Sequence, residues 1–529
     1  MTRPARLLQD VLVLSVRERP NHVAIVSGGV RLTYREVADH ASRMAWLLRD
    51  RGVERGDRVV VFMENNWRCA CAIFGVLVAG GVVVLVNAQT KRDKLAYVVS
   101  DAIAKVVVHE SSLSAVVEPV ADELASVRYL VTGDEDVLKN GRKSEWIDEV
   151  LQEFPTEMPP QSGITLDLAI LIYTSGTTGH PKGVMHTHQS LLFALESINE
   201  YLQIGTEDRI FSALPLSFGY GLFQWLSTLR AGAMLVLERS FTYPAVAFRL
   251  MRDEAVTIFP SVPTVFSMLV SQHAKQPLSF DTVRIVTNAA AALPNEFIPR
   301  LEEIFPNGRL YKMHGQTECI RTAFLDPSLA RVKQGSVGKA MPGTELMVLD
   351  EHLRPVHQGE VGTLYVRGPN VMKGYWRQPE KTAEVLVKLG PNGDLILNTG
   401  DLFYRDGDGD LYFVSRSDDV IKSRGEKVSP AEVEQVLYCM SQVREAVVVG
   451  IPDELLGEAV CVFVVVRDGQ TLSVQEVKRR CAEKLEGFMV PKHVVFLESL
   501  PVTENGKLSR KLIVERCSGL IRSSADLEG

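Results

Sequence analysis

Short runs of β-branched residues alternate with helix-like segments through most of the first 400 residues, and this alternation constrains the fold more than any other feature. The runs are apolar without a break, as in strands that helices cover on both faces. We therefore predict an α/β fold, with a large N-terminal domain of mainly parallel sheets flanked by helices. The predicted strands are Val59–Met63, Val82–Val86, Lys105–His109, Val127–Val131, Met234–Leu237, Thr257–Phe259 and Val283–Val286.

The pattern changes near residue 415, where a charged stretch precedes a second alternation of helices and strands. Pro430, with Ser429 before it, indicates the N-terminus of a helix. We predict a large domain over residues 1–417 and a small α+β domain over residues 418–529, which is long enough to hold its own core. The further elements predicted in the small domain are Glu445–Gly450, Ala459–Val466 and His493–Leu497 as strands and Ser473–Leu485 as a helix.

Composition excludes several classes of function. A formal net charge of −7 over 529 residues gives no support for a nucleic-acid partner, which calls for a basic face. The seven cysteines include no CxxC pair, so we expect buried free thiols in a reducing compartment. The longest apolar run, Ala70–Val86, is just shorter than a membrane span and is split by two glycines. We expect a buried helix and strand there, no transmembrane segment and a cytoplasmic protein.

The stretch YTSGTTGHPKGV combines three glycines, four serine or threonine hydroxyls and one lysine. A strand at Asp167–Tyr173 precedes it and a helix is expected after Gln189, so backbone N–H groups and hydroxyls could converge on a phosphate. The spacing differs from GxxxxGK[ST], because Pro181 precedes Lys182 and Gly183 follows it. A glycine-rich surface loop is the alternative. The candidate phosphate ligands are Thr174, Ser175, Gly176, Thr177, Thr178, Gly179 and Lys182.

These twelve residues resemble the phosphate-loop motif of the adenylate-forming superfamily, which includes acyl-CoA synthetases, adenylation domains of peptide synthetases and luciferases. Further motifs follow in the family's order across nearly the whole chain. The resemblance implies that ATP and Mg²⁺ activate a carboxylic acid to an acyl-adenylate, with release of pyrophosphate. A thiol, either coenzyme A or the phosphopantetheine of an acyl carrier protein, then displaces AMP. It also implies that the small domain is mobile and carries a catalytic lysine.

HGQTE, at His314–Glu318, resembles the family's YGxTE. The resemblance implies that Thr317 contacts the α-phosphate and that Glu318 binds magnesium, a hard cation that prefers oxygen ligands. Thr178 is implied as a further magnesium ligand. His314 stands where the family has a tyrosine that stacks on adenine, and a flat imidazole could stack in the same way. The remaining nucleotide contacts implied by this motif are Gly315 and Gln316.

Two shorter motifs concern the nucleoside. Asn288, Ala289, Ala290 and Ala291 align with a stretch of small residues that lines the adenine pocket in the family, although an alanine run also fits plain tight packing. NTGDL resembles the family's TGD motif, whose carboxylate binds both ribose hydroxyls. Asp401 is therefore the implied ribose ligand.

SRSDDVIKSRGEKVSPAEVE, which begins at Ser415, resembles the motif at the family's domain junction. The resemblance implies Arg416 near the ribose or phosphates, with Phe413 as a neighbouring nucleotide contact. Asp418 is the implied hinge. The thiol-partner residues implied by this motif are Lys422, Arg424 and Gly425, of which the two cations could equally belong to a solvated hairpin.

PVTENGKLSRK, from Pro501 to Lys511, resembles the PxTxxGKxxR motif near the family's C-terminus. Its lysine bridges the substrate carboxylate and the α-phosphate, so the resemblance implies that Lys507 stabilises the charge that develops during adenylation. Read alone, Asn-Gly before a lysine is typical of a turn with a solvated side chain.

LSFGYGL, at Leu216–Leu222, matches the segment where peptide-synthetase adenylation domains carry an aspartate for the substrate's ammonium group. Phe218 stands at that place, so an α-amino acid would leave its ammonium poorly compensated. We expect a fatty or aromatic acid, although Phe218 and Tyr220 also fit plain core packing. The predicted acid-pocket residues are Phe218, Gly219, Tyr220, Gly221, Val262 and Ala291.

The leading hypothesis is an AMP-forming acid–thiol ligase. A stand-alone amino-acid adenylation enzyme, an amide-forming ligase and an oxygen-using relative are alternatives with the same first step. A non-catalytic nucleotide-binding module is the alternative from another class. It predicts loss of the catalytic residues, yet Glu318, Asp401 and Lys507 are all present.

Overall fold

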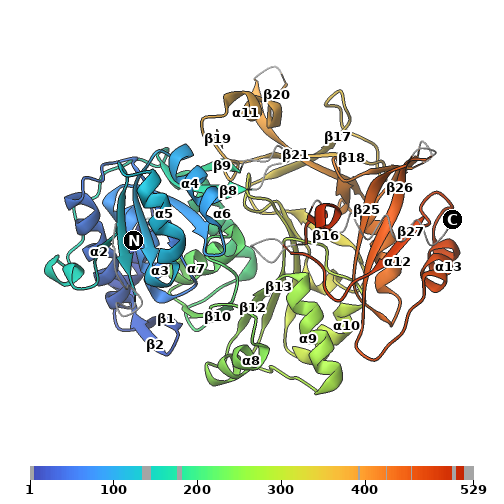
Figure 1. Ribbon diagram of the computed structural model, residues 1–529, viewed down its shortest axis with the longest axis horizontal. Helices are drawn as coiled ribbons and strands as arrows, with labels where there is room; N and C mark the ends of the chain where they lie inside the picture. The colour runs from blue at the N-terminus through green and yellow to red at the C-terminus, as the bar shows by residue number, and fades with distance from the viewer. Residues whose placement is uncertain are drawn as a thin grey trace.

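The computed structural model describes residues 5–133, 144–174, 181–390, 393–423, 426–453, 456–502, 508–510 and 512–516. Two large sheets with their helices form the N-terminal part, and a five-stranded sheet with its helices forms the C-terminal part (Figure 1). The last strand of the large sheets, β22 (Leu411–Arg416), ends just before the first strand of the small sheet, β23 (Ile421–Ser423). The expected fold class, a large α/β domain with a smaller C-terminal domain, is confirmed.

An eight-stranded sheet lies nearest the N-terminus, and its middle is parallel. The four predicted strands between residues 59 and 131 are confirmed to within two residues at their ends, because each is apolar and covered on both faces. The strands in sheet order are β19 (Gly374–Tyr375), β9 (Lys182–Thr187), β8 (Leu168–Thr174), β4 (Val82–Asn87), β3 (Arg58–Met63), β5 (Ala104–Glu110), β6 (Arg128–Thr132) and β7 (Glu145–Trp146).

A fourteen-stranded sheet combines a parallel half with an antiparallel half that the sequence patterns did not predict. The parallel half contains β1 (Val23–Ser27), β10 (Arg209–Ser212), β11 (Met234–Leu237), β12 (Ile258–Ser261), β13 (Ile285–Asn288) and β14 (Arg309–His314), with β2 (Val30–Thr33) antiparallel at its edge. The antiparallel half contains β15 (Ala323–Phe324), β16 (Ser336–Ala340), β17 (Glu345–Leu349), β18 (Gly362–Arg367), β20 (Leu386–Leu389), β21 (Asp394–Arg405) and β22.

Helices cover the faces of both sheets, and the largest apolar core lies beneath them. The apolar run after residue 67 forms a buried helix that ends before the paired glycines, as predicted. In the part of the chain that the structure describes, no helix is long and apolar enough to cross a membrane. The helices of the large domain are α1 (Asp10–Glu18), α2 (Tyr34–Asp50), α3 (Trp67–Ala79), α4 (Arg92–Asp101), α5 (Ser114–Glu123), α6 (His188–Leu202), α7 (Gly219–Ala231), α8 (Pro244–Asp253), α9 (Pro263–Lys275), α10 (Phe297–Ile304) and α11 (Pro379–Val385).

The segment after the predicted phosphate loop differs from expectation. We expected a strand, a loop and then a helix, but Lys182 begins strand β9, which pairs antiparallel with β8. The helix expected after Gln189 is confirmed as α6, which begins at His188, but it follows strand β9 and not the loop. Strand β9 was not predicted because residues 182–187 lack an apolar run of their own and are held as a strand by pairing with β8 and β19.

The small domain follows the predicted order of elements. They are β23, β24 (Glu426–Val428), α12 (Pro430–Tyr438), β25 (Val443–Asp453), β26 (Gly457–Val466), α13 (Val474–Lys484) and β27 (His493–Phe496). The domain packs beside α9 and α10 of the large domain (Figure 1). Its contacts there include the ion pair of Lys275 and Asp468 at 2.8 Å and an edge-to-face contact of the Phe297 and Tyr438 rings.

The cysteines partly follow expectation. The six that the structure describes are free thiols, and five of them are buried. Cys439 is exposed instead, because it lies at the end of α12, where its thiol donates to a Glu296 carboxylate oxygen at 2.9 Å. The seventh, Cys517, lies outside the described residues.

Candidate functional site

A cavity of about 760 Å³ lies where the ends of strands from both large sheets meet the small domain. Strands β8, β9, β13, β14, β21 and β22 all contribute residues to its wall. The predicted site residues that line it are Thr174, Lys182, Asn288, Ala290, Ala291, His314, Gly315, Gln316, Thr317, Glu318, Asp401, Phe413, Arg416 and Asp418. Residues as far apart in the sequence as Thr174 and Asp418 therefore converge on one cavity.

The remaining predicted residues fall into two groups. Those outside the described residues are Ser175, Gly176, Thr177, Thr178, Gly179, Arg424, Gly425 and Lys507. Those that are described but absent from the cavity wall are Ala289, Phe218, Gly219, Tyr220, Gly221, Val262 and Lys422. Lys422 is exposed on the hairpin formed by β23 and β24, as the solvated-hairpin interpretation expects.

The phosphate edge of the cavity is built on the ends of β8 and β9. Thr174 pairs with Lys182 across these strands, so the two ends of the predicted phosphate loop lie side by side. The Lys182 ammonium lies 5.0 Å from the centre of the Tyr375 ring, and the Tyr375 hydroxyl donates to a Glu318 carboxylate oxygen at 2.9 Å. One aromatic side chain thus joins the lysine at the phosphate loop to the implied magnesium ligand.

The HGQTE loop leaves the end of β14 and is held from behind by a buried histidine. His186 on β9 donates through Nε2 to the Thr317 carbonyl oxygen at 2.7 Å, and its Nδ1 faces the Ser190 hydroxyl. Burial lowers the pKa of His186 to about 4, so the ring is uncharged near neutral pH. A neutral ring that donates through Nε2 fixes the main chain at Thr317 and therefore orients the adjacent Glu318.

The predicted ribose ligand is a buried carboxylate. Asp401 is only 4% exposed, and its oxygens face His314 Nε2 at 3.1 Å and Arg416 Nε at 3.6 Å. The other ring nitrogen of His314 lies 2.7 Å from the Thr322 hydroxyl. His314 therefore orients the Asp401 carboxylate, a contact that the comparison with an adenine-stacking tyrosine did not predict.

Two buried polar atoms in the wall indicate that the cavity fits a nucleotide. Asn288 Oδ1 and Gln316 Nε2 are buried and lack a hydrogen-bond partner among the described residues. Such groups are costly to leave unpaired, and a bound ligand with donors and acceptors would satisfy them. Ala290 nearby has φ of +77°, a conformation that costs free energy for a residue with a Cβ and that occurs mostly at functional sites. The Glu318 carboxylate supplies the hard oxygen ligand that Mg²⁺ prefers.

The small domain closes one side of the cavity with helix α12. Glu434 and Tyr438 on this helix line the wall, and burial raises the pKa of Glu434. Arg510 donates to Glu434 at 2.7 Å and to Asp419 at 3.1 Å. The segment that follows Lys507 in the chain is therefore anchored to the cavity wall and to the domain junction.

The predicted acid pocket lies behind the wall. Tyr220 is buried, and its hydroxyl lies 2.5 Å from the Thr287 hydroxyl, next to the cavity residue Asn288. Gly221 does not open space for an acid, because a Cβ there would lie 2.2 Å from the Pro215 carbonyl oxygen. Gly219 has open space around it, with its nearest neighbour 4.0 Å from a built Cβ.

Three residues of the site were missed by the sequence reasoning. Tyr375 and His186 sit in short strands with no distinctive spacing. Lys312 left a signal, since it is a charged residue among the apolar residues of strand β14. It lines the cavity, and burial lowers its pKa to about 8.

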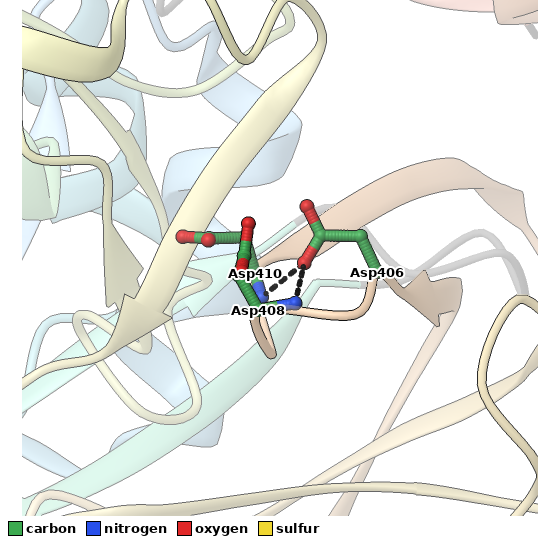
Figure 2. A group of neighbouring side chains, drawn as sticks. All are labelled: Asp406, Asp408 and Asp410. Carbon is green, nitrogen blue, oxygen red and sulfur yellow. Dashed lines mark hydrogen bonds between the residues drawn. The ribbon is translucent and has the colours of Figure 1, made fainter.

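An acidic cluster outside the cavity is a structural ion-pair network. Figure 2 shows Asp406, Asp408 and Asp410 at the turn between β21 and β22, where Asp406 accepts from the backbone N–H groups of the other two. The Lys333 ammonium lies within 2.9 Å of an oxygen of each carboxylate. A cation of the protein thus occupies the position that a metal ion would need.

The sequence matches the family described as AMP-binding enzyme over residues 13–376 and the AMP-binding enzyme C-terminal domain over residues 432–507. It is 30% identical to a long-chain-fatty-acid–CoA ligase of Bacillus subtilis over 97% of this chain and 95% of that protein. It is 31% identical to a feruloyl-CoA synthase of an Amycolatopsis species, over 94% and 96% of the two chains. The solved structure of a benzoate CoA ligase from Burkholderia xenovorans superimposes with a TM-score of 0.85 and 28% identity, over 96% of this chain and all of that one.

Proposed function

Because the chain belongs to the family of AMP-binding enzymes, we propose that it activates a carboxylic acid with a largely apolar body, either fatty or aromatic, at the cavity described above. It is an AMP-forming ligase that uses ATP, Mg²⁺ and coenzyme A. The observation that carries the proposal is the convergence of Lys182, Thr317, Glu318 and Asp401 on one cavity.

In the first half-reaction, a carboxylate oxygen of the acid attacks the α-phosphorus of ATP and the bond to pyrophosphate breaks. Asp401 would hold the ribose, while Thr317 and Lys182 would contact phosphate oxygens. Glu318 would hold Mg²⁺, which would neutralise part of the charge on the phosphates. Catalysis in this step is positioning plus charge stabilisation, so no nucleophilic side chain is required.

In the second half-reaction, a thiol attacks the acyl carbonyl carbon and AMP leaves. We propose that the small domain rotates about Asp418 between the two steps, as hinge closure does in other enzymes. Asp418 lies in the cavity wall, where its Oδ1 atom is 3.5 Å from Arg416 Nε. It falls between β22, the last strand of the large domain, and β23, the first strand of the small domain. Lys422, Arg424 and Gly425 are the proposed contacts for the phosphopantetheine arm of coenzyme A or of a carrier protein.

The character of the acid pocket supports an apolar acid. The Phe218 and Tyr220 rings meet edge to face, and Val262 is buried nearby in the same core. The relatives above are named for a long-chain fatty acid, ferulate and benzoate, all of which have apolar bodies. An α-amino acid would place an ammonium group against these rings, which is why amino-acid adenylation is the weaker alternative.

The proposal is tested by acid-dependent pyrophosphate release with ATP and Mg²⁺ across fatty acids of increasing length and aryl acids. Coenzyme A, a phosphopantetheinylated carrier protein and a simple amine are then supplied separately, and the acylated product is identified by mass spectrometry. We expect release with apolar acids and thioester formation with coenzyme A. Absence of release with every acid would refute the proposed function, and an amide product would favour the amide-forming alternative.

Lys507 provides a test of the two-step proposal. Lys507→Ala should lower acid-dependent pyrophosphate release by about 10²–10³, as expected when one charge-stabilising donor is lost. Thioester formation from supplied acyl-adenylate should be preserved, because that step does not involve attack on phosphorus. Lys484→Ala, at an exposed lysine of α13 in the same domain, is the matched control. Equal loss of both half-reactions would contradict the two-position proposal.

A further inference from the structure

Arg321 is a buried cation without a matching anion. It lies between β14 and β15, is only 4% exposed, and its Nε is buried without a hydrogen-bond partner. None of the ion pairs among the described residues includes it. A buried charge that lacks both a counter-ion and full hydrogen bonding is strongly unfavourable. The presence of an arginine at this buried position therefore calls for an explanation.

Two tyrosines surround the guanidinium, and they do not replace a counter-ion. The Arg321 Cζ atom lies 5.3 Å from the centre of the Tyr220 ring. Burial raises the pKa of Tyr201 to about 12 although the positive charge of Arg321 opposes that rise, so the phenol is uncharged at neutral pH. The free energy gained from one cation–π contact is smaller than the free energy lost when an ion is removed from water.

The cation lies directly behind the wall of the nucleotide cavity. A Cβ built on the cavity residue Gly315 would lie 2.8 Å from the Arg321 Cα, so the two backbones touch. The Tyr201 hydroxyl donates to the sulfur of Met313, which is also in the cavity wall, at 3.1 Å. The neighbouring Ile320 has φ of +62°, a conformation that is rare for a β-branched residue. Close packing and a strained backbone thus hold Arg321 beside the wall.

On the premise of the proposed function, we infer that Arg321 binds a second carboxylate on the acid, so that the natural substrate is a dicarboxylic acid with an apolar body. The reacting carboxylate would face the α-phosphate near Thr317, and the apolar body would lie against Tyr220. The distal carboxylate would then meet the guanidinium, whose fork of N–H donors matches a carboxylate in geometry and charge.

Pairs of acids that differ only in the second carboxylate test this inference. We would compare kcat/KM for pyrophosphate release with hexanedioic against hexanoic acid, and with benzene-1,3-dicarboxylic against benzoic acid. 3-Hydroxybenzoic acid adds a neutral acceptor at the same distance. In at least one pair, we expect kcat/KM for the diacid to exceed that for the monoacid by about 10- to 100-fold. Hydrogen bonds to a charged group contribute free energies that correspond to this range. A preference for the monoacid in both pairs, or for the hydroxy acid over the diacid, would overturn the inference.

Variants separate recognition from folding. Arg321→Met keeps the length of the side chain and removes the charge, so it should lower kcat/KM for the diacid about 10- to 100-fold and preserve or raise that for the monoacid. Arg321→Lys should restore part of the preference. Arg405→Met is the matched control, since this half-buried arginine donates to the Leu346 carbonyl oxygen instead. An unchanged ratio of diacid to monoacid in Arg321→Met would refute the inference.

A second readout does not require turnover. The diacid should raise the melting temperature of the wild type more than the monoacid does, and Arg321→Met should abolish that difference. Release with monoacids only would overturn the inference and leave the proposed function standing. Absence of release with every acid would overturn both.

Discussion

Three histidines of the large domain, His109, His186 and His188, are buried and uncharged, so mild acid should destabilise this domain. Burial lowers the pKa of each to about 4, from an ordinary value of 6.5 that the unfolded chain regains. Between these two values the unfolded chain binds more protons than the folded one. The stabilisation is therefore complete above pH 6.5 and is lost as the pH falls towards 4.

The expected size of the effect is large. Lowering the pH from 7.5 to 5 costs about 2 kcal/mol for each histidine, and about 6 kcal/mol for the three together. That is comparable with the total stability of an ordinary domain, about 5–15 kcal/mol. The measurement is thermal unfolding, followed by circular dichroism and tryptophan fluorescence between pH 7.5 and 5. We expect the melting temperature of the large domain to fall by about 7 °C, because a domain of some 400 residues has an unfolding entropy of about 0.85 kcal/mol/K.

A histidine remote from the cavity gives the matched comparison. His109 lies 2.8 Å from the Ser144 hydroxyl and takes no part in the site, so His109→Gln should reduce the pH dependence by about one third. His352→Gln, at an exposed position, should leave the dependence unchanged. A melting temperature that stays constant from pH 7.5 to 5.5, or an identical slope in wild type and His109→Gln, would refute the reasoning.

Two further substitutions test the packing and the geometry of the site. Gly221→Ala should destabilise the large domain by about 1–3 kcal/mol, because its Cβ would collide with the Pro215 backbone, whereas Gly219→Ala should be tolerated; equal melting temperatures would contradict this. Tyr375→Phe removes the donor to Glu318 and should lower acid-dependent pyrophosphate release about tenfold and raise the Mg²⁺ concentration required, since a hydrogen bond to a charged group contributes about 1.5–3 kcal/mol. An unchanged Mg²⁺ titration would show that the hydroxyl does not position the carboxylate.

Local pattern accounts for the parts of the fold that the sequence predicted. The buried strands from β3 to β6 and the elements of the small domain are marked by continuous apolar runs and by helix-start signals. Strand β9 has neither, because Lys182–Thr187 mixes a glycine with polar residues and is held by pairing with its neighbours. The antiparallel strands between residues 336 and 416 combine hairpin pairs, such as β17 with β18, with pairs farther apart in the sequence, such as β18 with β21, which no local pattern predicts.

The residues of the site divide in the same way, into those that a local pattern marks and those that only the fold brings together. Residues that belong to one contiguous motif, such as Thr317 and Glu318, could be predicted because the motif carries them together. Side chains that meet only in the folded chain could not. The Tyr375 hydroxyl reaches Glu318 across 57 positions, and His186 reaches Thr317 across 131. Arg321 lies within three residues of a predicted motif, but its lack of a counter-ion is visible only once burial is known.

The Lys333 network affects which residues of the site stay in place when the small domain moves. It fastens the far end of the β21–β22 hairpin, the same hairpin that presents Asp401 and Arg416 to the cavity. Asp418, the proposed hinge residue, comes only after that hairpin ends. The proposed swing of the small domain about Asp418 would therefore leave Asp401, the proposed ribose ligand, in place, so the adenylate would stay bound while its surroundings are exchanged. On this proposal, the activated acid would pass from the first half-reaction to the second without release into solution.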